Sequence, residues 1–435
     1  MNSMLSLRNI LLGVGLFGTI FAVLIFSGKI QIGRQDTTAR GEVQLWGTIP
    51  DEQMNPILQS FNPQAKTYAI RYTYVPEEDF NQRLLEALAS GTGPDLIFAR
   101  YQTILAQEER IFPFPTASLP EKTFRDTFVD GATILFGFQG AIGLPVTVDP
   151  LVLFYNRSIL SRRGIINPPI YWDEVGSLTP TLTARQGNRF TESAIALGTP
   201  NTPYAKDIIM AIVTQLGQSP VIHVPSNSGG YFSVEANTPV GEESDIMPLA
   251  TTNRFFTQFG DPGQKSYTWT DSLGDASTLF VGEKLAMYIG YASEYGTLRA
   301  RNPRADFGMT YLPQTRGYNT FSTGMKMYAV ATLKSSKNLT TALTAQSQLS
   351  GSGVAPSIAA VIGASPALRS YAATQGLDPV IARSILVARG WYDSHENGST
   401  EFTSAMISDI INYRYGVSDA SSMFVARMRD LYSKK

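Results

Sequence analysis

The stretch LLEALASGTGPDLIFARY, residues 84–101, constrains the fold most, because it joins an amphipathic helix to a short strand that is apolar on both faces. The helix is expected to begin at Pro76 and the acidic residues behind it, which suit the positive end of the helix dipole. Gly91 can end the helix in a left-handed cap, and a strand such as 96–98 is typical of a buried parallel sheet. This order of elements predicts an α/β fold.

The residues before this helix complete a strand-helix-strand unit. Segments 42–46 and 69–75 have the composition of strands, and segment 51–61 between them carries apolar side chains at helical spacing. In open α/β sheets, ligands bind beyond the carboxyl ends of the strands. We therefore expect the side chains that follow these strands to line a ligand site.

Three side chains leave the expected strands on this edge: Trp46, Arg100 and Tyr101. An indole and a phenol can pack on the C–H faces of a sugar, while a guanidinium donates hydrogen bonds to its hydroxyls. The three residues therefore form a candidate rim for a carbohydrate site. The alternatives are that Trp46 packs in or beside the core and that Arg100 forms a surface salt bridge.

The chain has 435 residues, more than one hydrophobic core usually supports, so at least two globular units are expected. Cysteine is absent, which excludes thiolate catalysis and thiolate metal sites. Only His223 and His395 could serve a histidine metal site or a catalytic triad, and both lie in polar surroundings. The net charge of -1 gives no basic field for nucleic-acid binding. We expect no metal, no cofactor and no nucleic-acid partner.

The amino terminus carries a 19-residue uncharged run at residues 10–28, which is long enough to span a bilayer. Residues 26–28 make a poor cleavage site, so an uncleaved transmembrane helix is preferred to a cleavable signal, which stays open as the alternative. Residues 1–28 are thus expected to form the membrane anchor or signal segment. Residues 29–41 are expected to form a polar tether.

The second half of the chain continues the α/β pattern. Residues 194–198 and 285–289 have strand character, and an apolar helix is expected at 207–216. A further helix is expected near 366–374. The strand at 285–289 leads into Tyr291, which again places an aromatic side chain at the carboxyl edge of a sheet.

Five motifs follow one another along the chain: ALASGTGPDLIF, GLPVTVDPLVLFYNRSIL, NPPIYWDEV, GEKLAMYIGYASEY and DFGMTYLPQ. Together they resemble the family 1 extracellular solute-binding proteins of ABC importers, the maltose-binding-protein-like group, over most of residues 42–432. The resemblance implies a two-lobed α/β fold of the type II periplasmic-binding-protein kind. It also implies a receptor that performs no chemistry, lies outside the cytoplasm and works with an ABC permease.

The resemblance divides each lobe between two segments of the chain. Lobe 1 is expected to comprise residues 42–145 and 325–374, and lobe 2 residues 146–324 and 375–435. A solute bound equally well by the open and closed forms would not shift their equilibrium. Both lobes are therefore expected to contribute contacts to the solute.

By the resemblance, Tyr204 and Tyr291 stand where the family places aromatic residues of its ligand cleft. Glu294 and Tyr295 follow Tyr291 closely and belong to the same candidate site. Trp269 lies in a polar stretch that is expected to be a loop, where an indole is either a sugar platform or a cover over a helix. We include it among the candidate ligand-binding residues.

The predicted solute is a sugar or an oligosaccharide. Two alternatives stay open: a peptide or polyamine as the solute, and a ligand-sensing subunit of a membrane signalling system. A glycoside hydrolase would need two carboxylates with separated pKa values, and no acid pair here forms such a motif. We therefore predict a membrane-anchored, non-catalytic protein that delivers a carbohydrate to a permease.

Overall fold

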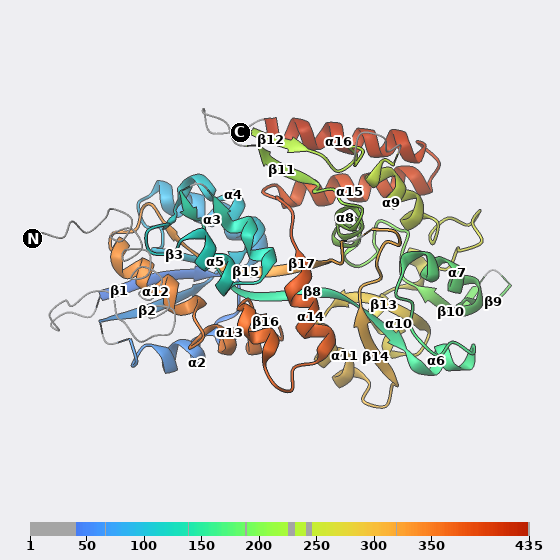
Figure 1. Cartoon of the computed structure of the whole chain (residues 1–435), viewed down its shortest axis with the longest axis horizontal. Coiled ribbons are helices and arrows are strands. Elements are labelled where there is room, and N and C mark those ends of the chain that lie inside the picture. The colour runs from blue at the N-terminus through green and yellow to red at the C-terminus, as the bar shows by residue number, and fades with distance from the viewer. Residues whose placement is uncertain are drawn as a thin grey trace, which may run out of the picture. The chain divides into compact units, whose positions relative to one another are not determined.

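The computed structural model of the chain (Figure 1) describes residues 41–433 except 66, 138, 188, 225–230, 241–245 and 319. The chain divides into two compact units. Unit 1 comprises the described residues up to Val148 together with Lys326–Gln375. Unit 2 comprises Asp149–Met325 and the described residues from Gly376 onward.

The sheet of unit 1 has three parallel strands with β1 between the other two, and β15 runs antiparallel beside β3. Its main strands are β1 (Gly41–Gly47), β2 (Tyr68–Tyr74), β3 (Leu96–Arg100) and the second half of β15 (Thr323–Leu333). Short strands add to it at β4 (Ile111–Phe112) and at β16 (Ser365–Pro366), which pairs with the first half of β8 (Leu144–Asn156). A separate small sheet contains β5 (Phe114–Pro115), β6 (Phe136–Gly137) and β7 (Gly140–Ala141).

Two helices of unit 1, α2 (Asp51–Phe61) and α3 (Glu77–Ala89), lie where the sequence pattern predicts them. The others are α4 (Tyr101–Ala106), α5 (Glu121–Thr127), α12 (Leu339–Ser350) and α13 (Ala355–Val361). Helix α3 starts directly after Pro76 with three acidic residues in its first turn. Gly91 takes a φ of 70°, the left-handed conformation expected of a glycine that ends a helix. The helix-to-strand turn in the stretch 84–101 is therefore confirmed.

The sheet of unit 2 places β13 between β10, which is parallel to it, and the second half of β8, which is antiparallel. Besides β8, the strands of this sheet are β9 (Ala184–Gln186), β10 (Arg189–Ile195), β13 (Leu285–Tyr291), β14 (Phe307–Tyr311) and β17 (Ala388–Arg389). A hairpin of β11 (Val221–Val224) and β12 (Tyr231–Val234) lies apart from this sheet. The strand expected at 194–198 thus begins and ends earlier, as β10.

The helices of unit 2 are α6 (Arg157–Arg162), α7 (Trp172–Leu182), α8 (Ala205–Gln215), α9 (Pro248–Thr257), α10 (Ala276–Val281), α11 (Glu294–Arg301), α14 (Pro379–Val387), α15 (Glu396–Ile411) and α16 (Val417–Ser433). Figure 1 shows α15 and α16 side by side, next to α8 and α9. Helix α8 is almost entirely buried and joins a core cluster that includes residues of α9, α15 and α16. This helical layer fixes the position of the first turn of α8.

The helix expected at 366–374 does not form. Ser365 and Pro366 instead pair with β8, and the N–H of Ala367 donates to the carbonyl of Val146. Pairing with β8 holds these residues in an extended conformation, so a helix cannot start at Pro366. Only a short 3-10 turn, Arg369–Ala373, follows.

Among the described residues, no helix combines the length and the apolar composition that crossing a membrane requires. The apolar run at residues 10–28 and nearly all of the expected tether lie outside the described residues.

Candidate functional site

A pair of tyrosines marks the carboxyl edge of β13 in unit 2. Tyr291 is the last residue of that strand, and Tyr204 directly precedes α8. Their ring centroids lie 4.9 Å apart with an interplanar angle of 77°, an edge-to-face contact. The structure therefore brings together the two aromatic residues that the resemblance implied.

Hydrogen bonds to two carboxylates fix this pair. The hydroxyl of Tyr291 donates to Oδ2 of Asp207 at 2.9 Å, and its backbone N–H donates to Oε1 of Glu294 at 2.7 Å. The second oxygen of Glu294 accepts a hydrogen bond of 2.7 Å from the hydroxyl of Tyr288. Glu294 also begins α11, where an acidic side chain suits the helix dipole. The carboxylate thus ties the end of β13 to the start of the next helix.

The backbone of Tyr204 is strained. Its φ of 57° and ψ of 27° lie in the left-handed region, which is an outlier for a bulky side chain. Such a conformation costs about 1–2 kcal/mol and persists only where the surroundings enforce it. Here the conformation delivers the Tyr204 ring to Tyr291 at the start of α8.

The phenols of Tyr204 and Tyr288 remain protonated. Burial raises the pKa of Tyr204, and the nearby carboxylates of Glu294, Asp149 and Asp207 raise it further. Burial and the bond to Glu294 likewise raise the pKa of Tyr288. The cluster therefore combines neutral hydroxyl groups with carboxylate acceptors, the set that polyhydroxylated ligands use for hydrogen bonding.

A buried ion pair holds the first turn of α8. The ammonium of Lys206 lies 2.7 Å from Oδ2 of Asp393, and the two side chains are only 8% and 1% exposed. Ser399 donates a hydrogen bond of 2.8 Å to the other oxygen of Asp393. Burial raises the pKa of Asp393, while the charge of Lys206 acts in the opposite direction. Lys206 stands between Tyr204 and Asp207 in the sequence, so the ion pair supports the turn that carries both.

The unit 1 candidates do not form a comparable cluster. Trp46 pairs with Ile97 in the sheet, so it shares a face with Ile97, and Arg100 lies on the opposite face. The guanidinium of Arg100 forms an ion pair with Glu77 at the start of α3, which was the alternative interpretation. Trp46 is half-buried.

Tyr101 is 2% exposed at the start of α4, so it offers almost no surface in this structure. Trp269 is also 2% exposed and belongs to a core cluster of unit 2 that includes Phe280 and Tyr288. Its polar neighbours in sequence had favoured an exposed loop, whereas its long-range contacts place it in the core. Tyr295 is 38% exposed and packs edge-to-face on Phe307.

Sequence reasoning included Glu294 among the candidate residues but missed Asp207, the carboxylate that accepts from the hydroxyl of Tyr291. Asp207 begins the helix expected at 207–216, three residues after Tyr204, and this closeness in sequence was the available signal. Asp149 accepts a hydrogen bond of 3.0 Å from the N–H of Ser293 just before α11. The pairing of Lys206 with Asp393 joins residues 187 positions apart and has no local signature.

The sequence profile of the bacterial extracellular solute-binding proteins matches residues 57–383. The chain belongs to this family. Curated relatives include proteins named as binding proteins in Brucella abortus strain 2308 and Brucella suis biovar 1 strain 1330, each 20% identical over 260 residues. The match covers 59% of this chain and 58% of each relative, so it spans little more than half of their length.

Solved structures share the fold of this solute-binding protein over nearly its whole length. The cyclic α-maltosyl-1,6-maltose binding protein of Arthrobacter globiformis has a TM-score of 0.72 at 16% identity, covering 91% of this chain and 100% of that one. A cyclo/maltodextrin-binding protein complexed with maltotetraose has a TM-score of 0.70 at 14% identity. The match covers 91% of this chain and 98% of that one. The Listeria monocytogenes ABC substrate-binding protein in complex with cycloalternan has a TM-score of 0.67 at 12% identity. The match covers 90% of this chain and 99% of that one. The two-lobed α/β periplasmic-binding-protein-like fold is therefore confirmed.

Proposed function

We propose that this solute-binding protein captures a sugar or oligosaccharide outside the cytoplasm and delivers it to the membrane subunits of an ABC transporter. The observation that carries the proposal is the edge-to-face pair of Tyr204 and Tyr291 with its carboxylate partners. Aromatic rings pack on the C–H faces of sugars, and carboxylates accept hydrogen bonds from their hydroxyls. Several proteins of the same fold are named for carbohydrate ligands, which supports this choice.

The proposed site extends from the tyrosine pair to Glu294 and Asp207. Tyr204 supplies a half-buried ring. Tyr291 is almost fully buried and packs edge to face against that ring. Tyr204 and Glu294 therefore form the ligand-contacting part of the proposal. Tyr291 and Asp207 keep that part in place.

In this proposal, units 1 and 2 act as the two lobes of the receptor. Trp46, Arg100, Tyr101, Tyr295 and Trp269 stay as candidate ligand contacts of the closed form. Ligand-driven closure requires contacts that differ between the open and closed forms. The burial of Tyr101 and Trp269 means that these two would have to change their surroundings to reach a solute.

The proposal assigns no chemical step to the protein. It also retains residues 10–28 as an uncleaved membrane anchor, which would keep the binding units next to the permease. Fractionation of cells that express the full chain tests the anchor: a membrane-bound protein of full mass supports it, and a processed protein in the soluble fraction contradicts it.

Titration calorimetry of the purified protein against mono- and oligosaccharides tests the carbohydrate assignment. The proposal predicts saturable binding of at least one of them. Binding of a peptide or polyamine in a parallel panel, without binding of any saccharide, would replace it.

A further inference from the structure

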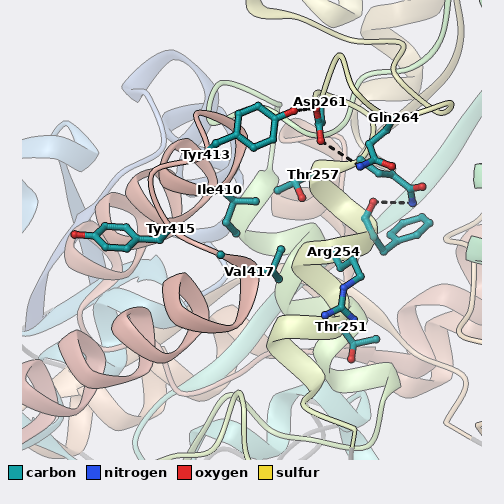
Figure 2. Close-up of a pocket in the computed structure, with 12 residues that line it drawn as sticks. Thr251, Arg254, Thr257, Asp261, Gln264, Ile410, Tyr413, Tyr415 and Val417 are labelled. Carbon is teal, nitrogen blue, oxygen red and sulfur yellow. Dashed lines mark hydrogen bonds between the residues drawn. The ribbon is translucent and has the colours of Figure 1, made fainter.

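A groove of about 620 Å³ lies on unit 2 between α9 and the turn that joins α15 to α16 (Figure 2). None of the residues that line it belongs to the tyrosine cluster described above. The volume falls within the range of sites that hold small molecules, about 300–1,000 Å³. The groove is therefore large enough to be a second ligand site.

The floor of the groove is apolar. Phe255 on α9, Ile410 near the end of α15 and Val417 at the start of α16 all line it. The ring of Phe255 is held by edge-to-face contacts with Trp172 at 5.5 Å and with Phe259 at 5.2 Å. A rigid apolar floor of this kind suits the hydrocarbon part of a ligand.

Two polar side chains along the groove, Asp261 and Gln258, are engaged in hydrogen bonds. Asp261 accepts hydrogen bonds from the hydroxyl of Tyr413, from the N–H of Gly263 at 2.8 Å and from Nε2 of Gln264 at 3.3 Å. Gln258 uses its Nε2 on the carbonyl of Phe255 and its Oε1 on Ser266 Oγ, each at 2.9 Å. These two side chains therefore contribute an ordered polar wall to the groove.

The side chain of Arg254, in contrast, is available to a ligand. It is exposed on α9, and within the part of the chain that the structure describes its guanidinium forms no hydrogen bond, ion pair or ring contact. Figure 2 shows Arg254 and Thr251 at one end of the groove and Tyr413 with Asp261 at the other. The groove thus offers a free, forked donor beside an apolar floor.

Tyr413 at the opposite end is held in a strained conformation. Its φ is 54°, in the position after a helix where glycine is usual, and its side chain is 71% exposed. The N–H of Arg414 donates to the carbonyl of Asp409 at 2.8 Å, which closes this turn. Glycine would adopt this left-handed conformation without strain. The chain has tyrosine here instead, and its ring lies at the rim of the groove despite the cost of the backbone conformation.

We infer that this groove binds a small molecule in which a carboxylate is attached to an apolar body. The carboxylate would pair with the guanidinium of Arg254 through two hydrogen bonds, the geometry that arginine favours. The apolar body would lie on Phe255, Ile410 and Val417 beneath the ring of Tyr413.

The test titrates 4-phenylbutyrate, the probe, into the full-length protein and detects binding by NMR. The expected Kd is on the order of 1 mM, which is reasonable for a ligand of this size. Arg254→Ala should weaken binding by about tenfold, because hydrogen bonds to charged groups have this strength. The uncharged analogue 4-phenylbutanamide should bind the unchanged protein about tenfold more weakly than the acid.

Three control variants separate binding in the groove from binding elsewhere on the protein. Arg304→Ala removes another exposed arginine of unit 2 and should leave the affinity unchanged. Tyr204→Ala alters the tyrosine cluster and should also leave it unchanged. Tyr413→Gly should weaken probe binding without lowering the melting temperature by more than about 2 °C, since it relieves the left-handed strain. Absence of probe binding, equal binding of acid and amide, or equal losses in Arg254→Ala and Arg304→Ala would overturn the inference.

Discussion

The hydroxyl of Tyr291 donates a hydrogen bond of 2.9 Å to Asp207, a residue 84 positions earlier in the sequence. This bond connects the end of a buried strand to the first turn of the helix that follows Tyr204. The tyrosine pair is therefore supported from both sides, by the strand that carries Tyr291 and by the helix that carries Asp207. Such support lowers the entropy that a ligand-contacting side chain loses on binding.

The bond itself can be removed without removing the ring. Tyr291→Phe should lower the free energy of unfolding by about 1–2 kcal/mol, because Asp207 loses a hydrogen bond in a largely buried setting. The edge-to-face contact with Tyr204 should remain. Urea unfolding measures the change, with Tyr295→Phe as the control for a more exposed tyrosine. Equal stabilities of Tyr291→Phe and the unchanged protein would show that the bond has no energetic role.

The buried ion pair beside the site should be sensitive to loss of one partner. Lys206→Met leaves the carboxylate of Asp393 buried without its cation and should cost about 3–5 kcal/mol of stability. Replacing both partners, Lys206→Met with Asp393→Leu, should recover most of that loss.

An exposed pair provides the matched control. Arg125 and Glu121 pair across one helical turn on α5, and both side chains are 55% exposed. Arg125→Met should cost less than about 1 kcal/mol. Equal losses in Lys206→Met and Arg125→Met, measured by chemical unfolding, would contradict the role assigned to the buried pair.

Acid should weaken the helix cap at Asp275. Burial raises the pKa of Asp275, but hydrogen bonds from Thr278 and Ser277 outweigh burial and lower it below its ordinary value of 3.8. A lowered carboxyl pKa gives stability that is present above the unfolded-state pKa and is lost as the pH falls through the folded-state value. The charged cap contributes about a few tenths of a kcal/mol to the free energy of unfolding, since Asp275 is largely exposed.

Asp275→Asn tests this directly, because asparagine caps a helix about as well but does not titrate. The unchanged protein should be the more stable of the two at pH 7, and the difference should be smaller at pH 3, where the pH approaches the lowered folded-state pKa of Asp275. Unfolding curves at both pH values give the comparison. A difference that stays constant between the two pH values would exclude the charged cap.

Local patterns in the sequence predicted the elements that depend on local chemistry. The start of α3 after Pro76 and its end near Gly91 follow from proline, charge and glycine preferences. The position of Tyr291 at the end of β13 follows from the apolar strand before it. These features need no knowledge of distant residues, so one sequence was sufficient.

Features that depend on distant partners could not be predicted in this way. Trp269 has polar neighbours in sequence, but contacts with residues such as Phe280 bury it. The segment at 366–374 has helical composition, yet its first residues pair with β8 and only a short 3-10 turn follows. The ion pair of Lys206 and Asp393 likewise depends on the packing of α8 against the segment that precedes α15.

The carbohydrate assignment is tested most directly by titration calorimetry with Tyr204→Gly. Glycine relieves the left-handed strain at this position, so the variant should fold while it lacks the ring proposed to contact the sugar. We predict that the unchanged protein binds at least one saccharide of a broad panel and that Tyr204→Gly binds it at least about tenfold more weakly, a loss within the range of removing an aromatic hot spot. Equal affinity of the folded variant, or no saccharide bound by the unchanged protein, would contradict the account.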